Sequence, residues 1–305
     1  MATDVWASWL LTRRDGDSAD MRARIAPTLA AFRDGVLERA DLAPDDVVLD
    51  VGCGTGLIGF GALERLGPDG RVIFSDVSPA LLDECRRTAA GDERCTFLRA
   101  SADDLSALAD ASVNVVTTRS VLIYSDRKAA AFAEFHRVLR PGGRLSIFEP
   151  INRFLVQQRP GDLFGLGDSP VADLLTKIYN QLRGKTTTDE TATDEITTGE
   201  TTTGESPMID FDERDLMDWA RAAGFSAVEL DYRAQIDVPA EPITDWAALQ
   251  RTAPNPLAPT YGEAIAAALT PDERERLDAY MTSFVAAGTP TRRTMALAYL
   301  RALRL

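Results

Sequence analysis

The chain has few of the residues that build disulfide frameworks and metal centres. Its 305 residues include one histidine and three cysteines, Cys53, Cys85 and Cys95. These cysteines lack the spacing of a zinc site and make a poor disulfide framework, which argues against a small secreted domain held by disulfides. A reducing, cytoplasmic setting is therefore expected, and no metal is expected as a cofactor.

Long apolar runs and positive charge are also scarce. No run of 18 apolar residues occurs, so no membrane span is expected. The first residues, MATDVWASWLLTRRDGD, carry no basic region of the kind that opens a secretory signal. The formal net charge is −14. Because such a surface repels phosphate backbones and anionic lipid, neither nucleic acid nor a membrane is expected as a partner.

Short apolar runs alternate with helical patterns along residues 46–150. The runs DVVLDV, RVIFSDV, CTFLRA, VNVVTTRSV and RLSIFEP predict buried strands. Ser78 and Pro79 are expected to begin one intervening helix, and Pro141 is expected to follow the end of another. Two later runs, SAVELDYRAQIDV and RRTMALAYLRAL, also predict strands. The alternation predicts an α/β fold with a parallel sheet covered on both faces.

The sequence divides further where its composition changes. We expect an N-terminal helical segment or lid at 1–43, a core at 44–150, a helical cap segment at 151–183, a disordered Thr- and Glu-rich loop at 184–206, and the rest of the core at 207–305 with a helical cap insertion at 241–288. Trp6 and Trp9 share a helix face, which suits either a packed helix or a lid over a ligand. Pro27 is expected to bend or restart the helix that follows.

The stretch VLDVGCGTGLIGF leaves a predicted strand and enters a predicted helix through a glycine-rich turn. Glycines let a ligand approach the backbone, and N–H groups gather where a helix begins. Gly52, Gly54 and Gly56 give one spacing, and Gly59 completes the pattern that binds dinucleotides. Asp50 would repel a pyrophosphate and attract an ammonium group, so it argues against a dinucleotide.

VLDVGCGTG resembles the first motif of the class I S-adenosylmethionine-dependent methyltransferases. Further similar segments follow in order: SDVS, RASADDL, VNVVTTRSVLIY and EFHRVLRPGGRLSIFEP. The resemblance is close over residues 44–150 and loose over 210–235. It implies a Rossmann-like sheet of seven mostly parallel strands with helices on both faces and a helical cap. It also implies S-adenosyl-L-methionine as the cofactor.

The resemblance places the cofactor at the carboxyl ends of the strands. The residues implied are Asp50, Gly52, Cys53, Gly54, Gly56, Asp76, Val77, Ser101, Ala102, Asp103 and Arg119. Asp76 is expected to accept both ribose hydroxyls. The family often has an acid where Ser101 stands, so we expect Asp103 or a backbone contact near Ala102 to recognise the adenine.

Catalysis is expected to rest on positioning, with a base only where the acceptor needs one. Glu149, Tyr124 and Arg119 are the candidate catalytic residues, since they lie beside the ends of the fourth and fifth predicted strands. Each also has an alternative role outside catalysis: a structural or solvated carboxylate for Glu149, a packed ring for Tyr124 and an ion pair for Arg119. His136 lies in a helix predicted to cover the sheet, so a structural role is expected for it.

These features predict methyl transfer to a small, partly apolar acceptor. Arsenite is not expected as the acceptor, because the cysteines do not cluster in the sequence. Two other functions stay open. One is an NAD(P)-dependent oxidoreductase, against which Asp50 and the later motifs argue. The other is a protein that binds S-adenosylmethionine without transferring its methyl group.

Overall fold

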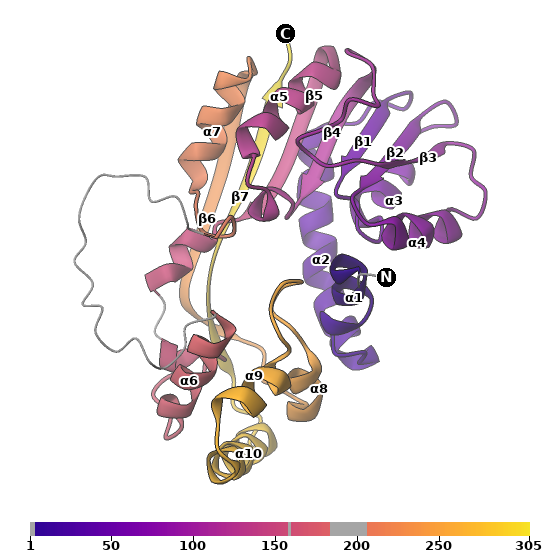
Figure 1. The fold of residues 1–305 in the computed structure, drawn as a ribbon. Coiled ribbons are helices and arrows are strands. Elements are labelled where there is room, and N and C mark those ends of the chain that lie inside the picture. The colour runs from indigo at the N-terminus through magenta and orange to yellow at the C-terminus, as the bar shows by residue number, and fades with distance from the viewer. Residues whose placement is uncertain (1–3, 158–159, 184–205) are drawn as a thin grey trace. The chain divides into compact units, whose positions relative to one another are not determined.

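A computed structural model describes residues 4–157, 160–183 and 206–305, and the chain forms two compact units (Figure 1). The sheet unit contains residues 25–156, 206–234 and 295–305. The helical unit contains the described parts of 1–24, 157–205 and 235–294. The division follows packing rather than sequence order, so the predicted segment boundaries stay predictions. Apart from Ser206, the predicted Thr- and Glu-rich loop lies outside the described residues.

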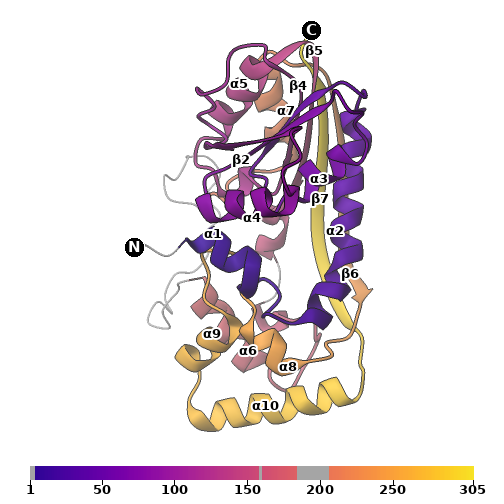
Figure 2. The same cartoon turned by 90° about the vertical axis from the view of Figure 1, so that its right-hand side faces the viewer.

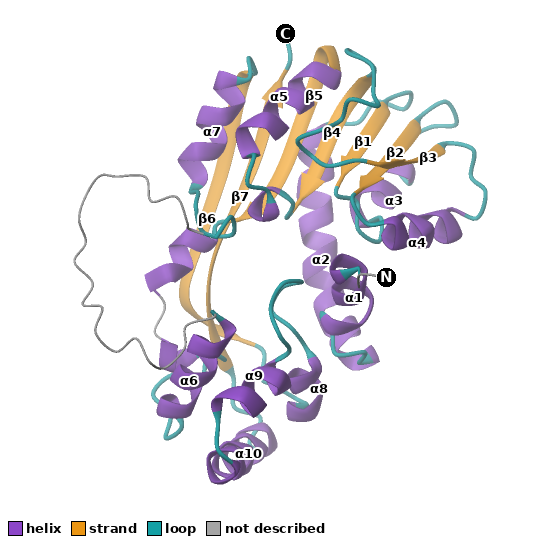
Figure 3. Ribbon diagram, in the orientation of Figure 1, coloured by secondary structure: helices purple, strands orange, loops and turns teal. Residues whose placement is uncertain are grey.

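The sheet has seven strands in the order β3-β2-β1-β4-β5-β7-β6 (Figure 3). They are β1 (Val47–Val51), β2 (Arg71–Asp76), β3 (Cys95–Arg99), β4 (Val113–Arg119), β5 (Leu139–Pro150), β6 (Ser226–Ala240) and β7 (Thr291–Leu303). The pairs from β3 to β5 are parallel, whereas β7 is antiparallel to β5. The prediction of a mostly parallel, Rossmann-like sheet is therefore confirmed.

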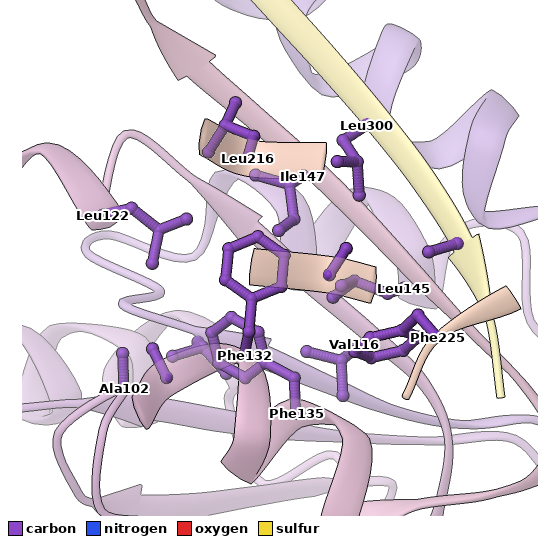
Figure 4. Packing of buried hydrophobic residues seen from close by; sticks show 14 of the residues in the cluster. Ala102, Val116, Leu122, Phe132, Phe135, Leu145, Ile147, Leu216, Phe225 and Leu300 are labelled. Carbon is purple, nitrogen blue, oxygen red and sulfur yellow. The ribbon is translucent and has the colours of Figure 1, made fainter. Parts of the chain in front are cut away.

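Helices cover both faces of the sheet, and each layer encloses its own apolar core (Figure 2). One face packs against α2 (Ala19–Ala40), α3 (Leu57–Leu63) and α4 (Pro79–Ala89). The other packs against α5 (Lys128–Val138) and α7 (Glu213–Ala222). In that second core Phe132 and Phe135 of α5 meet Ile147 of β5 (Figure 4). These contacts hold the parallel strands in register and so fix where their carboxyl ends lie.

Local sequence signals set most helix ends. Two prolines, however, do not have the effect predicted for them. Ser78 caps α4 as expected, accepting the Leu81 N–H at 3.1 Å. However, α2 does not restart at Pro27, because its later turns are buried against the sheet and outweigh the lost hydrogen bond. Pro141 does not follow a helix directly. α5 ends at Val138, and β5 begins at Leu139 with a shift in its register to β4.

The helical unit has an apolar core of its own. The elements of this unit are α1 (Val5–Ser8), the π-turn η1 (Trp9–Arg13), the 3₁₀ turn η4 (Pro160–Asp162), α6 (Ala172–Leu182), α8 (Trp246–Arg251), α9 (Tyr261–Ala268) and α10 (Pro271–Ala286). Side chains of α6, α8, α9 and α10 form its apolar cluster. The Trp9 indole donates to the Ala253 carbonyl at 2.9 Å, and the Ala253 N–H donates to the Arg13 carbonyl at 2.7 Å. The N-terminal tryptophan segment and residues 241–288 therefore belong to one unit.

The anchoring of the N-terminal segment can be tested with Trp9→Phe. Phenylalanine keeps most of the apolar area and removes the indole N–H that Ala253 accepts. We expect the free energy of unfolding in urea to fall by about 1 kcal/mol. Leu11→Ala, at a side chain 40% exposed, is the control and should change it by less than about 0.5 kcal/mol. Equal effects of the two substitutions would show that this hydrogen bond does not anchor the segment.

Candidate functional site

Polar side chains from several strands gather at one edge of the sheet. Because β1, β2, β4 and β5 are parallel, their carboxyl ends share this edge. Asp50 lies near the end of β1, Asp76 ends β2, Arg119 ends β4 and Glu149 is the penultimate residue of β5. This carboxyl edge of the sheet unit is where ligands bind in open α/β sheets, and it contains most of the residues predicted from the sequence.

The glycine turn between β1 and α3 has a backbone conformation that side chains rarely permit. Gly52, Gly54 and Gly56 have φ of 63°, 55° and 85°, a region that other residues rarely adopt. A β-carbon on Gly52 would lie 2.3 Å from a methyl group of Val121, in the loop after β4. The turn is closed by the Gly56 N–H, which donates to the Cys53 carbonyl at 2.8 Å. The sequence pattern thus marks a turn that only glycine suits.

Asp76 fixes the turn from the neighbouring strand. Its carboxylate accepts the Gly54 N–H and the Ser78 N–H, each at 2.9 Å, and the residue is 6% exposed. Val77, directly after it, leaves 43% of its apolar side chain exposed. A buried carboxylate and an exposed apolar side chain therefore stand side by side next to the glycines.

Asp50 joins three elements from inside the protein. One carboxylate oxygen accepts the Gly59 N–H of α3 at 2.9 Å, and the other accepts the Thr117 hydroxyl of β4 at 3.1 Å. Burial and, to a smaller extent, the nearby Asp76 charge raise the pKa of Asp50 to about 7, against the effect of these hydrogen bonds. Asp50 thus holds α3 and β4 to β1. Attraction of a ligand ammonium group stays a prediction.

The loop after β3 carries the residues expected near adenine. The Ser101 hydroxyl donates to Asp103, and Asp103 also forms an ion pair with Arg127 at 3.0 Å. Ala102 lies between them and is 7% exposed. The Ala100 N–H donates to the Asp76 carbonyl at 3.2 Å, which ties this loop to the end of β2. Ser101 and Asp103 therefore act as one hydrogen-bonded pair. Which of these residues meets adenine stays a prediction.

Arg119, at the end of β4, lies near three other candidate residues. Its positive charge lowers the pKa values of Asp50, Tyr124 and Glu149, which places it near all three. Tyr124 belongs to the 3₁₀ turn η2 (Leu122–Tyr124) and packs against the core of the sheet unit. Burial, followed by the Glu149 charge, raises the pKa of Tyr124 above its ordinary value. Tyr124 therefore stays a phenol, which can donate a hydrogen bond but is a poor base.

Glu149 is fully buried, with 0% exposure. One oxygen accepts the N–H groups of Val121 at 2.8 Å and Leu122 at 2.9 Å, and the other accepts the Ile123 N–H at 3.3 Å. Burial raises the pKa of Glu149 to about 7, although the three N–H donors favour its ionised form. This geometry favours the structural alternative for Glu149. A general base must reach the proton it removes, and these oxygens already bind the loop.

Cys53, Cys85 and His136 all pack inside the sheet unit. Cys53 and Cys85 come together around the Gly54 carbonyl oxygen, with sulfur–oxygen distances of 3.8 and 3.3 Å. Their mutual hydrogen bond and burial raise the pKa of the Cys53 thiol. His136 packs edge-on against Phe225, 5.1 Å between ring centres. Within the described residues, no group of three or more His, Cys, Asp or Glu side chains is arranged to hold a metal ion.

Comparison with known proteins identifies a domain that includes the residues at this edge of the sheet. A family model described as "Methyltransferase domain" matches residues 48–143, which include the glycine turn, Asp76 and Arg119. Residues 48–143 thus form a methyltransferase domain, in keeping with the resemblance to the class I S-adenosylmethionine-dependent methyltransferases. Two solved structures share the fold of this chain. The YcgJ protein of Bacillus subtilis has a TM-score of 0.51 at 14% identity, over 92% of this chain and 98% of that one. A chain of the Haloferax volcanii complex between the Trm112 methyltransferase activator and a methyltransferase has a TM-score of 0.51 at 18% identity, over 100% and 99%.

Curated relatives match parts of the chain. An arsenite methyltransferase from Halobacterium salinarum is 37% identical over 44% of this chain and 36% of its own length. A demethylmenaquinone methyltransferase from Clavibacter sepedonicus is 32% identical over 60% of this chain and 66% of its own length. The chain spans 36–47% of the length of the first four such relatives. Among the described helices, none has the length and apolarity to cross a membrane.

The cofactor of this family is S-adenosylmethionine, and the residues present at the carboxyl edge fit it. Three positive-φ glycines, at alternate positions of the turn, carry no side chains that would keep a ligand from the backbone. The Asp76 carboxylate can accept hydrogen bonds from ribose hydroxyls, and the exposed Val77 offers an apolar surface to the adenine ring. The individual contacts of these residues with the cofactor stay predictions.

Three residues around the site were not predicted from the sequence. Val121 packs against Gly52, Cys85 donates to the Gly54 carbonyl, and the buried Lys128 donates to the Ser125 carbonyl at 2.8 Å. Val121 and Cys85 lie in an apolar run and a helix that read as ordinary core. Lys128 carried a usable signal, since it is one of only three lysines in the chain.

The closeness of the glycine turn to the loop after β4 can be tested with Gly52→Ala. The added methyl group would collide with Val121, so we expect the affinity for S-adenosylhomocysteine to fall at least about tenfold, or about 1.4 kcal/mol. Gly91→Ala is the matched control, because Gly91 has φ of 85° and nothing within 4 Å of its added carbon. Isothermal titration gives both affinities. Equal losses in the two variants would attribute the effect to backbone strain alone.

Burial of Asp50 should make stability depend on pH. Its pKa is about 7 in the folded state and about 3.9 when unfolded, so the folded state binds the proton more tightly. The stability contributed by this group therefore falls as pH rises from about 4 to about 7 and is level above that. Asp50→Asn keeps an acceptor for Gly59 and a donor for Thr117 without the charge. We expect it to raise the free energy of unfolding at pH 8 by on the order of 1–4 kcal/mol and to have little effect at pH 4.

The control for this pH experiment is Asp69→Asn, at an exposed aspartate. Urea denaturation at both pH values measures the difference between the variants. A stability curve of Asp50→Asn that runs parallel to that of the unsubstituted protein would show that Asp50 is ionised in the folded state throughout this range.

Proposed function

We propose that this protein transfers the methyl group of S-adenosylmethionine to a small-molecule acceptor. The observation that carries the proposal is the Asp76 carboxylate bonded to the Gly54 N–H at 2.9 Å, within a turn of positive-φ glycines in a methyltransferase domain. The bound cofactor supplies a methyl group already activated on a sulfonium. What the chain must add is binding, orientation and exclusion of water.

The acceptor-side residues suit positioning better than proton removal. Arg119 brings a positive charge near Tyr124, and Tyr124 keeps its hydroxyl proton because its pKa is raised. Both can orient an acceptor that carries oxygen atoms. Asp50 and Glu149 are each 1% exposed or less, and both oxygens of each accept hydrogen bonds from the protein. Carboxylates in that state are poorly placed to take a proton from an acceptor.

An organic acceptor is favoured over the other classes. Relatives include a nocamycin O-methyltransferase from Saccharothrix syringae, 34% identical over 118 residues, as well as the demethylmenaquinone and arsenite enzymes. Soft ions such as arsenite bind thiolates, whereas Cys53 is buried and its pKa is raised. The net charge of −14 opposes nucleic acid. A cytoplasmic location stays a prediction.

The two other functions differ in what they should bind or transform. An oxidoreductase should bind NADH, and a non-catalytic binder should hold S-adenosylhomocysteine without turnover. We expect binding of S-adenosylhomocysteine and not of NADH in isothermal titration. A metabolite extract incubated with methyl-labelled S-adenosylmethionine should then yield a labelled small molecule. Binding without any labelled product from extracts of several sources would favour the non-catalytic binder.

Ribose recognition by Asp76 gives a sharper test. Asp76→Ala removes a charged acceptor, so the affinity for S-adenosylmethionine and S-adenosylhomocysteine should fall alike, by roughly 1.5–3 kcal/mol. The same substitution also frees the Gly54 and Ser78 N–H groups. Ser78→Ala, which removes only the hydroxyl cap of α4, is therefore the control. If Asp76→Ala binds both ligands as tightly as the unsubstituted protein does, Asp76 does not recognise the ribose.

A further inference from the structure

The loop after β4 is held in an unusual backbone shape. Ser120 has φ of 55°, a conformation that non-glycine residues rarely adopt. Its N–H donates to the Phe148 carbonyl of β5 at 2.9 Å. Such strain persists only where surrounding contacts enforce it. The contacts around Ser120 therefore determine the path of this loop.

Glu149 supplies the main contacts that enforce this path. The turn η2 begins with the consecutive N–H groups of residues 121–123, which lack partners inside the turn, as at any helix start. All of them donate to the Glu149 carboxylate, at 2.8, 2.9 and 3.3 Å. Glu149 itself is fixed because its residue in β5 pairs with Ala298 of β7. A rigid strand thus holds the start of the loop through one side chain.

A second buried charge holds the far end of the same loop. The Lys128 ammonium donates to the Ser125 carbonyl at 2.8 Å and to Asp210 at 2.6 Å, and it lies 5.1 Å from the centre of the Phe211 ring. Lys128 is 4% exposed. Residues 119–128 are therefore clamped between a buried carboxylate and a buried ammonium.

The clamped loop carries the groups that the proposed function uses. It begins with Arg119 and includes Tyr124, and Val121 in it packs against Gly52 of the cofactor turn. We propose that Glu149 is a positioning residue, which holds residues 119–124 against the glycine turn and so keeps the cofactor site in its binding shape. This inference rests on the proposed function, since it assigns Glu149 a task within that site.

Two substitutions at Glu149 separate positioning from proton transfer. Glu149→Gln keeps one oxygen that can accept the two short hydrogen bonds, so we expect the affinity for S-adenosylhomocysteine to fall only about threefold. Glu149→Ala leaves three N–H groups unpaired, so we expect a fall of about thirtyfold or more. A general base would behave differently: both variants would lose turnover and keep the affinity. That pattern would overturn the inference.

Asp46→Asn is the matched control. Asp46 is a carboxylate of similar burial, 3% exposed, which accepts the Ala43 N–H at 2.7 Å and pairs with Arg144 at the opposite edge of the sheet. It should lower stability without changing the affinity for S-adenosylhomocysteine. If Asp46→Asn lowers this affinity as much as Glu149→Ala does, general destabilisation explains both and the inference fails.

A measurement without any ligand covers the case in which Glu149→Ala does not fold. In Glu149→Gln, the Ile123 amide loses its acceptor, so its hydrogen exchange should accelerate at least about tenfold, while exchange in β1 stays unchanged. Unchanged exchange at this amide would overturn the inference. The failure of the proposed function looks different. The unsubstituted protein would then not bind S-adenosylhomocysteine at all, whatever stands at position 149.

Discussion

Asp50, Asp76 and Glu149, three carboxylates almost removed from water, accept backbone N–H groups at the carboxyl edge of the sheet. Asp50 accepts one from α3, Asp76 accepts one from the glycine turn, and Glu149 accepts those of the loop after β4. Loop amides need partners when they are buried, and a loop cannot pair with itself as a helix or strand does. The parallel strands place an acid near three of their ends and thereby supply those partners. The shape of the glycine turn and of the loop after β4 depends on this arrangement.

Burying these carboxylates costs free energy, because a charged group loses its hydration. This cost bears on the kind of reaction that the site can support. Burial raises the pKa values of Asp50 and Glu149 to about 7, so their charged forms are held against desolvation. Their hydrogen bonds with backbone N–H groups offset part of this cost. Among the described residues, the buried carboxylates at this edge are poorly placed to act as a base, which suits a reaction whose methyl group arrives already activated. Substrates that need a strong base to react would be poorly served.

The sequence predicted the parts of this edge that depend on local signals. Positive φ at Gly52, Gly54 and Gly56 follows from their spacing between a strand and a helix, and the place of Asp76 follows from its position at a strand end. The role of Glu149 could not be predicted in this way, because its burial depends on β7, which pairs with β5 from about 150 residues further along the chain. The same holds for Trp9, whose partner Ala253 is 244 residues away. The restart expected at Pro27 does not occur, because helix propensity is local, whereas the packing of α2 is not.

The position of β7 has a consequence for how the chain is made. This strand follows all the other strands of the sheet in sequence, yet it lies between β5 and β6 rather than at an edge. During synthesis, β5 must wait with one side unpaired until residues 291–303 have left the ribosome. Until then the β7 side of β5 is open next to Glu149, and an exposed strand edge can pair with other chains. The nascent protein thus passes through a stage in which strands β1 to β5 are complete in sequence but the sheet is still open.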